Sequence, residues 1–144
     1  MKHKGAIMEY SKERMDDLMR AYDEYISSCD YIRMSEVYKI IVNMPSRRFW
    51  VSDIRAALII SAMMRGKTDL STMCPLKNEM YEEIYNRVFK LQEECPELTI
   101  SELCAKVIAQ PAPKFYLTPG SAKVMVCKAR KQWIQEKWKR LRLL

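Results

Sequence analysis

Residues 34–52, MSEVYKIIVNMPSRRFWVS, and residues 100–118, ISELCAKVIAQPAPKFYLT, are two copies of one pattern that lie 66 residues apart without a gap. Most other positions hold similar residue types in both copies. The identical pairs include Ser35 and Ser101, Glu36 and Glu102, Pro45 and Pro111, and Phe49 and Phe115. A constant offset of this kind is typical of an internal duplication. The sequence therefore predicts one structural unit repeated in tandem.

Apolar residues recur at steps of three and four on both sides of this pattern, which is typical of helices. In the first copy we expect helices from Ser11 to about Cys29, from Met34 to Asn43 and from Asp53 to Arg65. Proline ends the second of these helices, Ser52 caps the third, and Gly66 terminates it.

The second copy repeats this scheme after a loop over residues 67–75. Its first helix is expected from about Lys77 to Glu94. Thr99 and Glu102 have the spacing of a capping box that opens the next helix. Thr118 followed by proline predicts the start of a final helix that runs nearly to the end of the chain.

Together these elements predict a mostly all-α fold of about six helices, a tandem duplication of a three-helix unit. We expect one compact domain over residues 1–144, with repeat units at 11–66 and 77–132 and a basic C-terminal helix at 118–144. The chain holds only 3 Gly and 6 Pro, which disfavours a turn-rich β fold. Short extended segments near 47–51 and 113–117 are expected to pair.

The duplication also predicts a core, because apolar character that is kept in both copies usually marks packing positions. The residues expected to be buried are Phe49, Phe115, Ile41, Val107, Leu58 and Val124. In the final helix, an apolar face of Ala122, Val126, Ala129 and Trp133 is expected to dock on the body of the protein, with Trp133 as a core anchor.

The positive charge is concentrated at the C-terminal end. The chain has a formal net charge of +7, and residues 111–144 carry nine Lys or Arg against Glu136 alone. Lys128, Lys131, Lys139 and Arg142 fall on one face of the expected helix, and Arg130 adds another cation beside them. Because this face holds no acidic partner, it is repulsive unless something anionic lies against it. Nucleic acid is the commonest such partner.

Two other interpretations of this helix stay open. It can be a solvated amphipathic element whose tryptophans anchor it, or one that docks on a protein; it can also rest on a membrane surface. A second candidate signal lies in the duplicated segment, where Arg47, Arg48 and Lys114 stand beside aromatic residues and can contact phosphates while the rings stack. The alternative is that the phenylalanines are core residues and the cations point to water.

No nucleotide-binding, hydrolase or metalloprotease motif occurs, and His3 is the only histidine. We therefore expect no enzyme, no cofactor and no metal site. The five cysteines have no C-x-x-C spacing and predict buried, reduced thiols. No apolar stretch is long enough to span a membrane, and no secretory signal is visible, so we expect a cytoplasmic protein without membrane insertion.

The segments PAPKFYLTPGSAK at 111–123 and MPSRRFWVS at 44–52 are similar to those of small basic proteins of gut Bacteroidetes genomes and their phages or mobile elements. That family has no established activity and lends no site residues, but it implies a bacterial or phage setting. The expectation is a non-enzymatic accessory or regulatory protein that binds nucleic acid, DNA rather than RNA. The alternative is a module of a phage or mobile element that binds a host protein.

Overall fold

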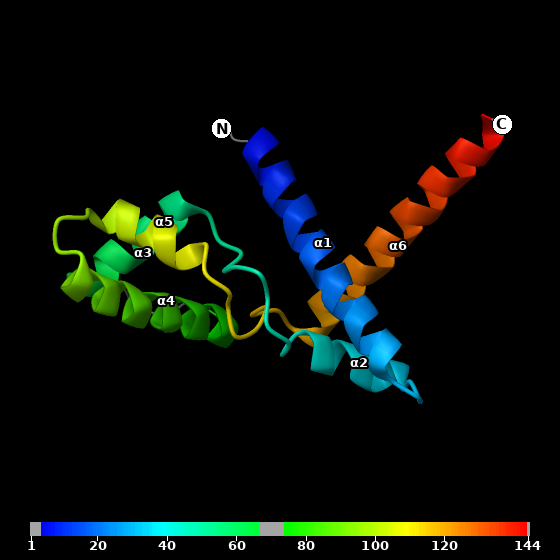
Figure 1. Cartoon of the computed structure of the whole chain (residues 1–144), viewed down its shortest axis with the longest axis horizontal. Coiled ribbons are helices and arrows are strands. Elements are labelled where there is room, and N and C mark those ends of the chain that lie inside the picture. The colour runs from blue at the N-terminus through cyan, green and yellow to red at the C-terminus, as the bar shows by residue number, and fades with distance from the viewer. Residues whose placement is uncertain (1–3, 67–73, 144) are drawn as a thin grey trace. The chain divides into compact units, whose positions relative to one another are not determined.

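The computed structural model describes residues 4–66 and 74–143, and this part of the chain is mostly helical. The all-α fold predicted from the sequence is confirmed, with six helices and no strand among the described residues. In chain order the helices are α1 (Lys4–Ser28), α2 (Met34–Ile41), α3 (Asp53–Met64), α4 (Pro75–Glu94), α5 (Ile100–Ile108) and α6 (Pro119–Arg142) (Figure 1).

The predicted helix ends are largely confirmed. The side-chain oxygens of Ser52, Thr99 and Thr118 each accept a hydrogen bond from the backbone amide three residues further on, at 3.1, 3.2 and 3.1 Å. The carboxylate of Glu102 completes the capping box by accepting from the Thr99 amide at 3.4 Å. Gly66 follows α3 with a φ of 68°, a conformation that glycine adopts without steric cost.

Some helix bounds differ from the expectation. Ser11 lies inside α1 and does not cap it, because the preceding residues include no proline that would stop the helix. α4 begins at Pro75, two residues before the expected start, since proline suits the first turn. The helix expected to reach Asn43 ends at Ile41. His3 and most of the expected inter-repeat loop lie outside the described residues.

The helices pack in a grouping that differs from the repeats. α3 packs against α4 and α5, whereas α6 packs against α1 and α2. The chain accordingly divides into two compact units. We call α1, α2 and α6 the terminal unit, which is built from residues 1–44 and 117–144, and α3, α4 and α5 the central unit, residues 45–116. Each unit thus takes two helices from one repeat and the third helix from the other.

One pair of backbone hydrogen bonds joins matched positions of the two repeats inside the central unit. Ser46 and Ala112 form an isolated antiparallel bridge, with both N–H to O distances at 3.0 Å. The longer pairing expected over 47–51 and 113–117 does not form. The reason is that the Phe49 amide donates to the carbonyl of Ile108 at the end of α5, at 3.0 Å. This amide is therefore not available to pair with the opposite segment.

Matched positions of the two repeats are buried in both units. The pairs without or almost without exposed surface are Leu18 and Ile84, Val37 and Leu103, Ile41 and Val107, Ala56 and Ala122, Ile60 and Val126, and Phe49 and Phe115. Leu58 and Val124, also expected in the core, are instead 61% and 68% exposed. They lie two residues from the buried positions Ala56 and Ala122, and a two-residue step on a helix turns a side chain to the opposite face.

Phe49→Ala should lower the free energy of unfolding by roughly 3–5 kcal/mol, because it empties a fully buried site. The ring stacks on Tyr116 at a centroid distance of 6.1 Å and lies 4.9 Å from the guanidinium of Arg87, so both contacts are lost as well. Urea denaturation measures the change. The control Leu58→Ala removes an exposed side chain and should stay within about 0.5 kcal/mol. Equal losses in the two variants would contradict this assignment of the core.

Candidate nucleic-acid interface on the C-terminal helix

α6 has a docked first half and an exposed second half. Thr118 caps the helix, and Ala122 and Val126 are buried in the terminal unit. From Arg130 to Leu143 every residue is exposed. Figure 1 shows that this half of the helix, at the red end of the chain, diverges from α1. Side chains on most of its circumference are therefore open to a partner.

The four cations predicted on one face of this helix are all exposed. We call Lys128, Lys131, Lys139 and Arg142 the basic face, and Gln135 lies between them. Within residues 4–66 and 74–143, no ion pair joins any of the four to a carboxylate. Four like charges along one face repel one another, and an anionic backbone placed against that face would relieve the repulsion.

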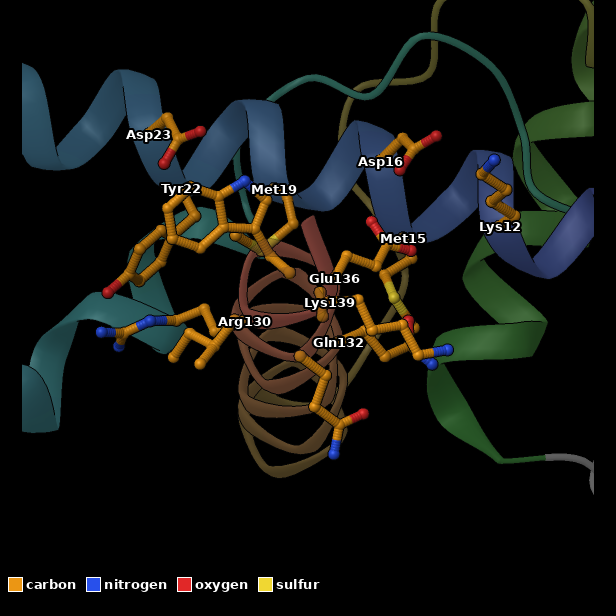
Figure 2. A pocket seen from close by; sticks show the side chains of 14 residues that line it. Lys12, Met15, Asp16, Met19, Tyr22, Asp23, Arg130, Gln132, Glu136 and Lys139 are labelled. Atoms are coloured by element: carbon orange, nitrogen blue, oxygen red, sulfur yellow. The ribbon is translucent and has the colours of Figure 1, made fainter. Parts of the chain in front are cut away.

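Arg130 points away from the basic face. It lines a groove between α6 and α1, where Figure 2 shows it near Tyr22. Burial raises the pKa of Tyr38 on α2, and the positive charge of Arg130 acts in the opposite direction, which places this guanidinium close to α2. The structure therefore separates Arg130 from Lys128, Lys131 and Arg142, whereas Lys139 lines the same groove.

The apolar residues of the exposed half are not core anchors. Trp133 is 62% exposed, and Trp138 is 59% exposed. The expectation that Trp133 docks α6 on the body of the protein is wrong, because the close packing of α6 ends with Ala122, Val126 and the half-buried Ala129. Lys137 lies over the Trp133 ring, 5.2 Å from its centroid, so this cation contacts an aromatic face.

The cations of the duplicated segment, Arg47, Arg48 and Lys114, belong to the central unit. Arg48 donates from Nε to the Phe49 carbonyl at 3.1 Å and from an Nη atom to the Val51 carbonyl at 3.0 Å. Its guanidinium also lies 5.1 Å from the Trp50 ring. These contacts fix the conformation of the connection between α2 and α3.

Lys114 pairs with the carboxylate of Glu79 on α4 and lies 5.5 Å from the ring centroid of Tyr116. Burial raises the pKa of that tyrosine to about 12, so its hydroxyl stays neutral. Arg47 is exposed. The structure thus gives Arg48 and Lys114 roles in local packing, and the candidate interface rests on α6.

Sequence reasoning missed the groove between α1 and α6. The groove has a volume of about 1020 Å³, and Met15, Met19 and Tyr22 of α1 line it together with Trp133 and Ile134 of α6 (Figure 2). The signal that pointed to it was a difference in length, since the helix expected after Thr118 is about twice as long as its counterpart after Ser52.

Other kinds of site are not marked in the described part of the chain. Residues 4–66 and 74–143 contain no group of three or more His, Cys, Asp or Glu residues placed to hold a metal ion. Over the same residues, none of the helices has both the length and the apolar character needed to cross a membrane. Comparisons with protein-family models, with curated proteins and with solved structures give no match for this chain.

Arg48→Gln should destabilise the protein by about 1–3 kcal/mol, because it removes a charged donor from two backbone carbonyls in a half-buried connection. Thermal unfolding followed by circular dichroism measures the effect. The matched control is Lys131→Gln, which removes an exposed cation and should leave the melting temperature within about 2 °C. An Arg48 variant as stable as this control would show that the connection does not depend on the guanidinium.

Proposed function

We propose that this protein binds nucleic acid, with the basic face of α6 lying along the phosphate backbone. The observation that carries the proposal is the basic face itself, whose four cations are exposed on one side of α6 and form no ion pair with a carboxylate among the described residues. From Lys128 to Arg142 the face extends over about 21 Å at about 1.5 Å per residue. That length covers roughly six base pairs at about 3.4 Å each.

Duplex DNA is the form of nucleic acid that fits this helix best. The major groove of B-DNA is about 12 Å wide and admits an α-helix, whose diameter with side chains is about 10–12 Å. The major groove of an RNA duplex is deep and narrow and does not admit one. A helix that is exposed over its last 13 residues, Arg130 to Arg142, can enter a groove without unfolding the unit that carries it.

The role that we propose is that of an accessory or regulatory protein, without catalysis. Burial raises the pKa of Cys104 to about 11, so this thiol is protonated at neutral pH and is a poor nucleophile. The resemblance to proteins of Bacteroidetes and their phages implies a bacterial cytoplasm, where DNA is accessible. In this account the bound DNA is the target of the protein and is not its substrate.

Binding to duplex DNA should weaken steeply as salt rises. If all four cations of the basic face contact phosphates, the slope of log K against log salt is about −3.6, at about 0.9 per contact. Affinity then falls roughly 150-fold between about 50 and 200 mM monovalent salt. Fluorescence anisotropy of a labelled duplex measures both quantities. Replacing Lys128, Lys131, Lys139 and Arg142 by Gln should abolish most of the slope.

The control variant removes four exposed cations from the central unit, Arg65, Lys77, Lys90 and Lys106, again by substitution with Gln. It has the same net charge as the basic-face variant, so the pair separates a local interface from general attraction. The control should keep most of the slope. Equal losses in both variants would contradict an interface on α6. Absence of wild-type binding at low salt would favour an acidic protein as the partner of this face.

A further inference from the structure

The groove between α1 and α6 borders the basic face, because Gln135 and Lys139 are among its lining residues. Met15, Met19 and Tyr22 form its wall on α1 and are only half-buried. Figure 2 shows Met15 and Met19 extending from α1 towards α6, with polar side chains of both helices at the edges. On α6 the wall includes Trp133 and Ile134, which are 62% and 46% exposed. Apolar side chains therefore line an open space.

In the central unit, side chains fill the corresponding space between the matching helices α4 and α3. Tyr81 and Tyr85 of α4 stand at the positions that match Met15 and Met19 of α1. Tyr81 is buried, and Tyr85 packs against the core of the central unit. On the facing helix α3, Met63 and Met64 also pack against that core.

In α6 the residues that match Met63 and Met64 are Ala129 and Arg130. A short side chain and a charged one thus replace two long apolar ones. α3 ends at Met64, whereas α6 continues to Arg142 and carries further apolar residues beyond the groove. The groove is therefore a property of the terminal unit alone, and the three-helix arrangement does not require it.

The dimensions of the groove match a short helical segment. A helix of about 10–12 Å diameter fills roughly 120–170 Å³ per residue, so a volume of about 1020 Å³ holds about two turns. The exposed apolar stripe of α6 has a similar length. It consists of Trp133, Ile134, Trp138 and Leu141, which recur at helical spacing over nine residues.

The charges around the groove are balanced. Lys12, Arg130 and Lys139 supply three cations, and Asp16, Asp23 and Glu136 supply three anions. Such an edge neither attracts nor repels a strongly charged partner, in contrast to the basic face. In a contact with twofold symmetry, the same surface of each copy faces that of the other. A surface that carries charges of both signs can therefore pair opposite charges across such a contact.

We infer that the occupant of this groove is a second copy of the chain. The apolar stripe of α6 from each copy lies in the α1–α6 groove of the other, so one surface supplies both the receptor and the inserted helix. In this contact Lys139 lies at the edge of the interface, whereas Lys128, Lys131 and Arg142 are outside the groove lining. The dimer then offers two basic helices while its apolar residues are covered.

Sedimentation velocity in about 0.5 M salt without nucleic acid tests this inference separately from DNA binding. At tens of micromolar the wild type should sediment as a dimer, twice the chain mass of 17.1 kDa. Ile134→Glu should raise the dissociation constant by roughly 30-fold or more, because it places a carboxylate in an apolar contact. Since Ile134 is exposed in the single chain, circular dichroism should show an intact fold.

The matched control is Val124→Glu, which makes the same change of charge on the same helix at a residue that is 68% exposed and outside the groove. This variant should remain dimeric. A monomeric wild type at about 100 µM would overturn the inference. So would an Ile134→Glu variant that dimerises as well as the wild type, or equal dissociation of both variants. A monomer that still binds DNA would overturn the dimer alone and leave the proposed function standing.

Discussion

The reciprocal bridge between Ser46 and Ala112 is the constraint on which the arrangement of the chain depends. Each of these residues follows the proline that ends a second helix, and each donates to the carbonyl of the other at 3.0 Å. The bridge fixes the two connections side by side and antiparallel. With the connections held in this way, each third helix packs with the first two helices of the other repeat. The repeats are therefore exchanged, and neither makes a compact unit with its own third helix.

This exchange gives the two third helices different roles. α3 is short and ends in methionines that close the central unit. α6 keeps the same buried start, with Ala122 and Val126, and then continues as an exposed amphipathic helix. The shared part of the duplication thus supplies the scaffold, and the part in which the copies differ supplies the two candidate surfaces. One of these is basic, and the other is apolar with balanced charges at its edge.

Much of the fold followed from residue types with a local effect. Ser52 and Thr118 are caps, and the matched pair Ile41 and Val107 is buried as expected. The exchange of the third helices between the repeats could not be predicted from the sequence. The two helices present similar apolar faces, with Ala56 and Ala122 at the same position, so the pattern does not say which repeat each helix packs against. The exposure of Trp133 depends on how far a neighbouring helix extends, which periodicity does not encode. The exposure of Leu58 was accessible to sequence reasoning, since it lies about 200° from Ala56 on the helix.

The candidate site was predicted in part. Sequence reasoning found the four cations of the basic face, because an unmixed charge pattern on a helix is visible without coordinates. It could not separate them from Arg48 and Lys114, whose contacts with carbonyls, a carboxylate and aromatic rings depend on the folded connection.

The most direct measurement of the central claim, that α6 binds nucleic acid through its basic face, is a titration of the ¹⁵N-labelled protein with duplex DNA, followed by amide chemical shifts. The account predicts that the changes concentrate between Lys128 and Arg142. Changes concentrated in α3, α4 or α5 would contradict it.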